Sequence, residues 1–114
     1  MFNDEAKDPF DYRLKVRVEG HGSTMTLYPV GDLDVTTARV LRAALAADLH
    51  EFRSVVVDLS GVTSMDSTGL ATLLDARRAL LADGRVLAVQ NAPAQTGRLL
   101  ELAGVADLLL DRPN

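Results

Sequence analysis

The fold of this chain is decided by a valine-rich stretch near its middle, Ser54-Val55-Val56-Val57-Asp58-Leu59. An unbroken run of this kind predicts a strand that is buried on both faces, as the strands of parallel sheets are. Residues 59–65 then indicate a loop, and Asp66-Ser67-Thr68-Gly69 opens a helix whose leucines recur at spacings of three and four. A strand that leads into a helix is the building unit of an α/β sheet.

Patterns of the same kinds continue on both sides of this unit. Alternating apolar and charged residues at 12–18 predict a strand with one solvated face, and a glycine-rich turn joins it to a second strand in an antiparallel hairpin. The later helices end at glycines. The predicted strands are 12–18, 24–30, 54–59, 86–89 and 105–110, and the predicted helices run from 38 to 52, from 66 to the stop at 83–84, and from 94 to 103.

This order of elements predicts an α/β fold with a mixed, mostly parallel sheet, an N-terminal β-hairpin and helices packed mainly on one face. The charged side of the first strand indicates that the second face of the sheet is partly open. A chain of 114 residues suits a single domain. We expect a flexible acidic tail at residues 1–11 and the folded domain at residues 12–112.

Composition excludes several classes of protein. The net charge of −4 and the isoelectric point of about 5.0 argue against nucleic-acid binding. The sequence has no cysteine, which excludes disulfides and thiolate metal sites. Its N-terminus lacks the features of a signal peptide, and no apolar stretch approaches the ~20 residues that span a bilayer. We therefore expect a cytoplasmic protein with no nucleic-acid partner and no direct membrane binding.

The sequence carries no pattern typical of an enzyme. It has neither a phosphate-binding glycine loop nor a nucleophile elbow. His21 and His50 share no spacing with each other or with carboxylates, which indicates surface histidines. Asp32 and Asp34 resemble the start of a calcium loop, but the glycine and the closing glutamate of such a loop are missing. We expect no catalytic residues, no cofactor and no metal.

One segment, Met65-Asp66-Ser67-Thr68-Gly69-Leu70, is unusual for a helix start. A helix needs one capping oxygen, whereas three candidate caps stand here in a row before a glycine. One interpretation is that Asp66 or Ser67 caps the helix and the rest is incidental. The other is that the glycine permits a close approach by a backbone or a nucleotide, while Ser67 presents its hydroxyl. A phosphate on Ser67 would lie at the positive end of the helix dipole.

A second segment, Gly31-Asp32-Leu33-Asp34-Val35-Thr36-Thr37-Ala38, also joins a strand to a helix. If the two strands are adjacent and parallel, both of these loops lie at the same edge of the sheet. Asp34 and Thr37 would then stand near Ser67. The alternative is that Asp34 or Thr36 serves as a helix cap.

Together these two segments closely resemble the STAS domains of anti-sigma factor antagonists. The resemblance covers roughly residues 12 to 110 and includes the segment Arg98-Leu99-Leu100-Glu101-Leu102-Ala103-Gly104. It implies that Ser67 is a phosphorylation site. It further implies a partner-binding surface formed by Asp34, Thr37, Asp66, Thr68 and Gly69.

The resemblance also implies the partners of the chain. The first is an anti-sigma factor that is itself a serine kinase of the GHKL type, which binds the unphosphorylated antagonist and releases a sigma factor. Phosphorylation ends that binding, and a PP2C-type phosphatase restores it. Independently of the resemblance, we expect a monomer or a weak homodimer.

Two other signalling roles fit parts of the sequence. Val55-Val56-Val57-Asp58 suggests the acceptor aspartate of a receiver domain, but a receiver uses a lysine after its last strand and no lysine follows Lys15. A STAS domain that acts as a non-phosphorylated adaptor subunit of a membrane transport or signalling complex is the second alternative. The hydroxyl at Ser67 argues against an adaptor without excluding it.

Overall fold

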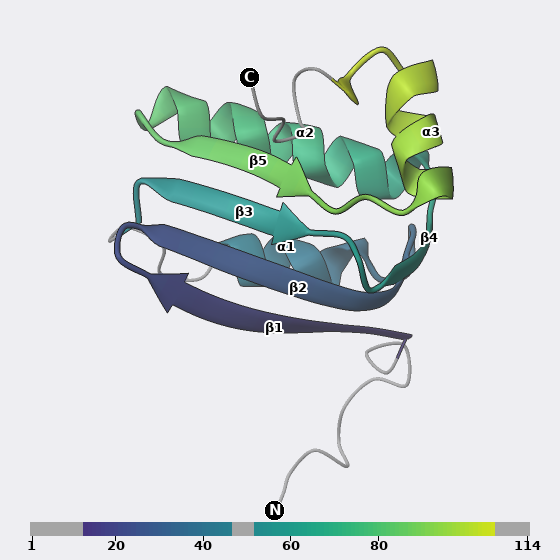
Figure 1. Ribbon diagram of the computed structural model, residues 1–114, viewed down its shortest axis with the longest axis horizontal. Helices are drawn as coiled ribbons and strands as arrows, with labels where there is room; N and C mark the ends of the chain where they lie inside the picture. The colour runs from purple at the N-terminus through teal and green to yellow at the C-terminus, as the bar shows by residue number, and fades with distance from the viewer. Residues whose placement is uncertain (1–12, 47–51, 107–114) are drawn as a thin grey trace, which may run out of the picture.

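The computed structural model describes residues 13–46 and 52–106 of the chain. The predicted tail at 1–11 lies outside these residues, and so do residues 107–110 of the predicted last strand. The elements, in chain order, are β1 (Leu14–His21), β2 (Thr24–Leu33), α1 (Ala38–Ala46), β3 (Ser54–Asp58), β4 (Val62–Met65), α2 (Ser67–Ala82), β5 (Val86–Gln90) and α3 (Ala94–Leu102) (Figure 1).

In the described residues the sheet has five strands of mixed direction. β1 and β2 form the predicted antiparallel hairpin, in which His21 lies opposite Thr24. β2 pairs in parallel with β3 over its first residues and with β4 over its last, and β5 pairs in parallel with β3. α1 and α2 lie on one face of the sheet, and α3 lies at the end where β4 is (Figure 1). The predicted mixed, mostly parallel sheet with helices on one face is confirmed.

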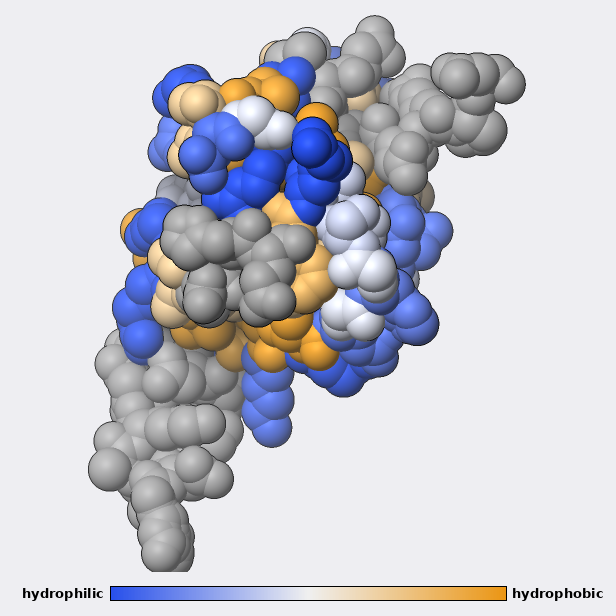
Figure 2. Space-filling model, turned by 90° about the vertical axis from the view of Figure 1, so that its left-hand side faces the viewer, coloured by the Kyte–Doolittle hydropathy of each residue, from blue (hydrophilic) through white to orange (hydrophobic). Residues whose placement is uncertain are grey.

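The core lies between the sheet and the two helices on its face. Alternate residues of each long strand point into this layer, so that Leu27, Val55 and Val89 are fully buried. Leu41 of α1 and Leu73 of α2 meet them from the helix side. Seen from the end that carries the hairpin turn, apolar side chains gather in the middle of the molecule and polar ones surround them (Figure 2).

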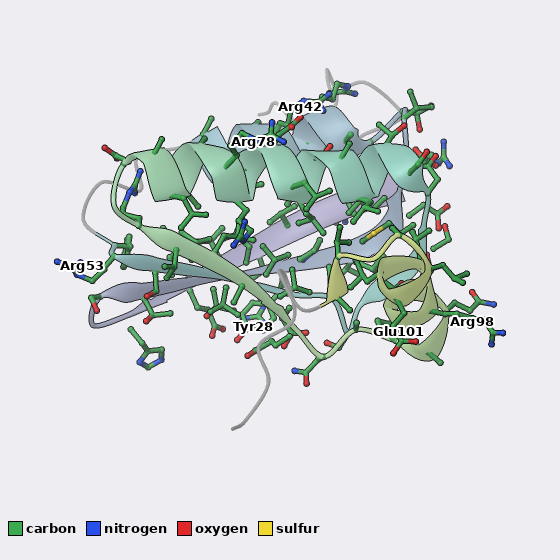
Figure 3. The ribbon with its side chains drawn as sticks, turned by 90° about the horizontal axis from the view of Figure 1, so that it is seen from above. Tyr28, Arg42, Arg53, Arg78, Arg98 and Glu101 are labelled. Atoms are coloured by element: carbon green, nitrogen blue, oxygen red, sulfur yellow. The ribbon has the colours of Figure 1, made fainter. Side chains whose placement is uncertain are left out.

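The opposite face of the sheet, called the open face below, is partly solvated as the alternation in the first strand predicts. Tyr28 lies on this face, whereas Arg42 and Arg78 lie on the outer side of the helix layer (Figure 3). Val56 also points to the open face and is half-buried. The prediction that the valine-rich strand is buried on both faces is therefore wrong, because no helix of the described residues covers its second face.

Three predicted boundaries also need correction. Residues 62–65, predicted as loop, form β4, because they gain backbone partners on β2. Phe52, predicted as the last residue of the first helix, is not helical, and residues 47–51 of that predicted helix lie outside the described residues. Val105 and Ala106, predicted to begin a last strand, are not part of a strand. The error at β4 arises because pairing between distant segments, and not local pattern, decides the structure there.

Asp58 ties together the loops at the carboxyl ends of β3 and β5. Its buried carboxylate accepts hydrogen bonds from the backbone N–H (2.9 Å) and the hydroxyl (2.6 Å) of Ser60. The side-chain amides of Gln90 (3.0 Å) and Asn91 (2.7 Å) donate to its other oxygen. Both oxygens are engaged by the chain itself, which gives Asp58 a structural role unlike that of a receiver's acceptor aspartate.

We expect Asp58 to make the fold sensitive to acid. Burial raises the pKa of Asp58, but the hydrogen bonds from Ser60, Asn91 and Gln90 outweigh it, so the pKa is lowered overall. A carboxyl whose pKa is lower in the folded state stabilises the fold above its ordinary pKa, and this stabilisation is lost as the pH falls through the folded value. Urea unfolding should therefore give a free energy that falls as the pH is lowered below about 5.

The substitution Asp58→Asn isolates this contribution. It should lower the free energy of unfolding at pH 7 by about 1–3 kcal/mol and flatten the decline toward acid. Asp75→Asn is the matched control, because Asp75 is exposed and forms a surface ion pair with Arg78. Equal pH profiles for Asp58→Asn and the parent chain would contradict this assignment.

Candidate functional site

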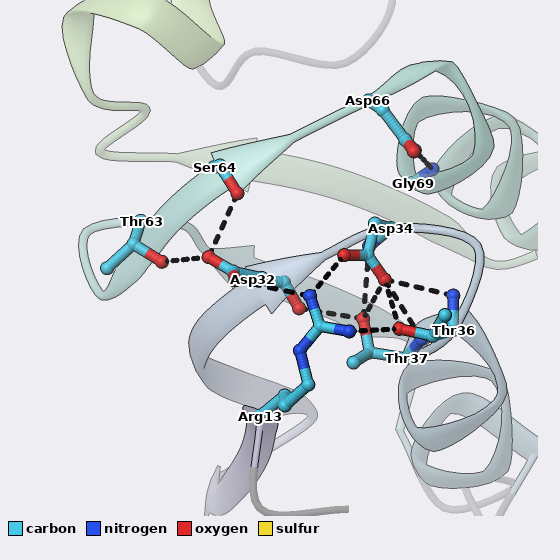
Figure 4. Close-up of polar contacts among 9 residues, drawn as sticks. All are labelled: Arg13, Asp32, Asp34, Thr36, Thr37, Thr63, Ser64, Asp66 and Gly69. Atoms are coloured by element: carbon cyan, nitrogen blue, oxygen red, sulfur yellow. Dashed lines mark hydrogen bonds and ion pairs between the residues drawn. The ribbon is translucent and has the colours of Figure 1, made fainter. Parts of the chain in front are cut away.

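The parallel pairing of β2 with β4 brings the two loop segments together. Leu33 at the end of β2 lies opposite Met65 at the end of β4. The backbone N–H of Asp66 donates to the carbonyl oxygen of Leu33 at 3.2 Å. Asp34 and Asp66, each the next residue along its strand, therefore leave the sheet side by side (Figure 4). We call the surface made by residues 32–37 and 63–69 the loop edge.

The two loops lie side by side, as predicted. The strand that places the second loop there is β4, and the prediction had assigned this role to β3. The sequence assigned the second loop to the valine-rich strand, which is β3. The structure inserts β4 between that strand and α2, and β4 takes over the pairing with β2 at Gly31 to Leu33. The prediction required two adjacent parallel strands. The last residues of β2 and the short strand β4 are that pair.

Gly31 allows this change of partner. Its φ of +123° lies outside the range that other residues adopt readily, and the register of β2 against β4 shifts immediately after it. A Cβ at this position would lie 1.9 Å from the carbonyl oxygen of Arg13. A glycine is therefore required where β1 crosses the bend in β2.

The first loop is a turn built around the carboxylate of Asp34. Its Oδ1 accepts hydrogen bonds from the backbone N–H (2.9 Å) and hydroxyl (2.7 Å) of Thr36 and from the N–H of Thr37 (3.2 Å). The hydroxyl of Thr37 donates to the carbonyl oxygen of Asp32 at 2.7 Å and accepts from the N–H of Asp34 at 3.0 Å. Asp34 thus caps the turn that leads into α1, and Thr37 is fully buried beneath it.

Arg13 joins the start of β1 to this turn. Its guanidinium donates to Asp34 Oδ2 at 2.9 Å and to the hydroxyl oxygen of Thr36 at 2.8 Å, and it lies 3.5 Å from Asp32 Oδ2. Asp32 Oδ1 in turn accepts from the hydroxyls of Thr63 (2.5 Å) and Ser64 (2.9 Å) on β4. The result is a continuous polar network across three strands (Figure 4).

This network lowers the pKa of two carboxyl groups. The pKa of Asp32 is lowered mainly by the hydrogen bond from Thr63, with Ser64 and Arg13 adding to the effect. The pKa of Asp34 is lowered mainly by the hydrogen bond from Thr36, against the opposing effect of burial. Both side chains are therefore ionised at neutral pH. The loop edge carries at least these two negative charges beside the single positive charge of Arg13.

The second loop ends at the N-terminus of α2, which Asp66 caps. The carboxylate of Asp66 accepts from the N–H of Thr68 (2.9 Å) and of Gly69 (3.2 Å). Ser67, the first residue of the helix, is exposed. Among the described residues no hydrogen bond engages its hydroxyl, whereas the neighbouring Thr68 is half-buried. Asp66 therefore does the capping, and the Ser67 hydroxyl faces solvent.

Gly69 is explained by the close packing of α2 against β2. A Cβ on this residue would lie 2.8 Å from both Cγ and the carbonyl oxygen of Leu33 and 2.9 Å from Cγ of Met65. A close approach of the kind that the sequence suggested is thus made by Leu33 and Met65 of the chain itself. Gly69 is buried, and its small size lets the start of α2 lie against Leu33 and Met65.

The site residues predicted from the sequence all lie in the two segments of the loop edge: Asp34, Thr37, Asp66, Ser67, Thr68 and Gly69. Sequence reasoning missed Arg13, Thr63 and Ser64. The register of the hairpin was the available signal for Arg13, because Leu14 lies opposite Gly31 and Arg13 is therefore next to Asp32. In residues 13–46 and 52–106, no group of three or more acidic, histidine or cysteine side chains could hold a metal ion.

Comparison with known proteins agrees with this architecture. Residues 16–111 match the family described as "Mlab, STAS domain". The anti-sigma-B factor antagonist of Staphylococcus aureus is 34% identical over 80 residues, which are 69% of this chain and 74% of the relative. The corresponding antagonist of Staphylococcus epidermidis has the same identity and coverage. The chain belongs to the STAS domain family.

Solved structures share the fold. An anti-sigma factor antagonist from Mycobacterium paratuberculosis is 25% identical with a TM-score of 0.79, covering 94% of this chain and 90% of that one. The unphosphorylated anti-sigma factor antagonist SpoIIAA is 17% identical with a TM-score of 0.73, covering 88% and 90%. This second likeness concerns the fold alone. Within the residues that the structure describes, no helix is long and apolar enough to cross a membrane.

The packing at Gly69 makes a testable prediction. Gly69→Ala should lower the free energy of unfolding by about 1–3 kcal/mol, because the added methyl overlaps Leu33 and Met65. Gly97→Ala in α3 is the matched control, since its nearest neighbour would lie 4.0 Å away, and it should raise the free energy by up to about 1 kcal/mol. Urea unfolding of both variants measures the difference. Similar values for the two would mean that Gly69 is not constrained by packing.

Proposed function

We propose that this chain is an anti-sigma factor antagonist that binds an anti-sigma serine kinase of the GHKL type at the loop edge and is inactivated by phosphorylation of Ser67. The observation that carries the proposal is the exposed Ser67 hydroxyl, which no hydrogen bond of the described residues engages, at a helix start that pairs with Leu33 next to the ordered turn at Asp34. The curated relatives of this chain are anti-sigma-B factor antagonists, which supports the same role. One solved structure of the same fold is described as the phosphorylated form of SpoIIAA.

The chain acts as a substrate and supplies one reacting group. The Ser67 oxygen attacks the γ-phosphorus of ATP held by the kinase, the bond between that phosphorus and the bridging oxygen breaks, and ADP leaves. The hydroxyl proton passes to a base on the kinase, which also holds the magnesium ion. We therefore propose a regulator that carries neither cofactor nor catalytic residue of its own. Its action on an anti-sigma serine kinase implies a cytoplasmic location.

The residues of the loop edge have two proposed roles. Some contact the kinase, and others hold the two loops in position. Asp34, Asp66 and Thr68 retain exposure and are the proposed contacts with the kinase. Thr37 and Gly69 are buried, so their proposed part is to hold the turn at Asp34 and the start of α2 in place. The prediction that Thr37 meets the partner directly is replaced by this positioning role.

Phosphorylation switches the complex off through local charge. A phosphate adds about −1.5 to −2 charges. On Ser67 it would stand beside Asp66 and across from the ionised Asp34, so it would conflict with any partner surface that had accommodated the hydroxyl. The N-terminus of α2 tolerates an anion, so the fold does not need to change. A PP2C-type phosphatase would reverse the modification.

The first test compares Ser67→Ala with Ser67→Glu as baits in host-cell lysate. The alanine variant should retain a GHKL-type kinase and the glutamate variant should lose it, as identified by mass spectrometry. Ser23→Glu, at the exposed turn between β1 and β2 and outside the loop edge, is the matched control for a negative charge added at an exposed serine and should keep the kinase. Retention of the same non-kinase partner by both Ser67 variants would support the adaptor role and contradict this proposal.

A second test asks whether the switch acts without refolding. Ser67→Glu should change the free energy of unfolding by no more than about 0.5 kcal/mol, because Ser67 is exposed and an anion suits the helix N-terminus. Thermal and urea unfolding measure this directly. A sharp loss of stability would show that the charge disrupts the fold instead of the partner contact.

A further inference from the structure

The outer edge of β1 is a second feature that the proposed function does not use. β1 stands at the end of the strand order and pairs with β2 alone in the described part of the chain. It runs from Leu14 to His21, and most of its residues are exposed. Figure 1 shows this strand along the outside of the sheet. A sheet edge of this length presents backbone donors and acceptors that another strand can satisfy.

The side chains at the middle of β1 form a pattern that is complementary to itself. Arg17 and Glu19 lie opposite Tyr28 and Thr26 on the open face and form an ion pair with each other. The Arg17 guanidinium lies 4.1 Å from the centre of the Tyr28 ring, which holds it on this face. Between them Val18 points to the other face and is 47% exposed.

We propose that two copies of this chain pair through β1 in antiparallel fashion, about a two-fold axis at Val18. In that register Arg17 of each copy lies directly opposite Glu19 of the other, and the four charges alternate in sign. The two Val18 side chains meet at the axis and cover each other's exposed surface. On the same side Val16 faces Gly20 of the second copy, over which the Phe52 ring of that copy lies.

The charges on β1 favour the register with its axis at Val18 over the registers with the axis one residue away. An axis at Arg17 would set the two arginines against each other, and an axis at Glu19 would do the same for the two glutamates. Like charges directly opposite each other destabilise an antiparallel pair. Here the register centred on Val18 turns both charges into attractive contacts.

The pairing leaves both candidate sites open. The Leu14 end of β1 lies beside Gly31 and therefore beside the loop edge, whereas the His21 end lies at the hairpin turn. Antiparallel pairing about Val18 sends the two loop edges to opposite ends of the joined sheet. Each Ser67 then remains accessible, so the dimer is compatible with the proposed function and does not depend on it.

The test is sedimentation velocity of the full chain from about 1 µM to about 1 mM, the range in which a small interface associates. The parent chain should shift from monomer to dimer across this range. Arg17→Glu and Glu19→Arg should each raise the dissociation constant about tenfold or more. The double variant Arg17→Glu/Glu19→Arg should restore it to within about threefold, because the opposite charges face each other again.

Val30→Lys is the matched control, because Val30 is a similarly exposed valine on β2 and not on the edge. It should leave the dissociation constant unchanged, and circular dichroism should show all variants folded. A parent chain that stays monomeric at every concentration overturns the proposal. So does a dimer that persists in both single variants, or a double variant that fails to regain association.

Discussion

The parallel contact between the last residues of β2 and the short strand β4 is the interaction on which the candidate site depends. It places Asp34 and Asp66 next to each other although 32 residues separate them in the chain. Two glycines make the contact possible. Gly31 permits the bend at which β2 changes partner, and Gly69 lets α2 approach Leu33 closely. The position of Ser67 relative to the first loop follows from these constraints on the backbone.

Most polar side chains around this contact are already engaged by the chain itself. Asp32, Asp34 and Asp66 accept hydrogen bonds from threonine, serine, arginine and backbone donors, which hold both loops in one conformation. Ser67 differs, because its hydroxyl is exposed and unengaged among the described residues. The edge is therefore ordered before any partner arrives. A modification of Ser67 changes the charge of a surface that the core supports independently.

The fold and most of the site could be predicted from the sequence because their signals are local. Helix periodicity, the hairpin turn and the capping residues at Asp34 and Asp66 each lie within a few residues. β4 could not be predicted, since its four residues include two exposed polar side chains and show no strand pattern. The roles of Arg13 and Gly69 depend on which segments come together in space, and the burial of Thr37 does too. In each case the contacts between segments that are distant in the sequence decide the role of the residue.

The most direct test of this account is the footprint of the kinase on the chain, measured from the amide chemical shifts of the isotope-labelled protein during titration. The account predicts that residues of both loops, 32–37 and 63–69, shift together while the open face of the sheet and β1 beyond Leu14 do not. A phosphorylated chain should show no such shifts at the same kinase concentration. A footprint confined to one loop, or centred elsewhere on the domain, would contradict the claim that the two loops form one surface.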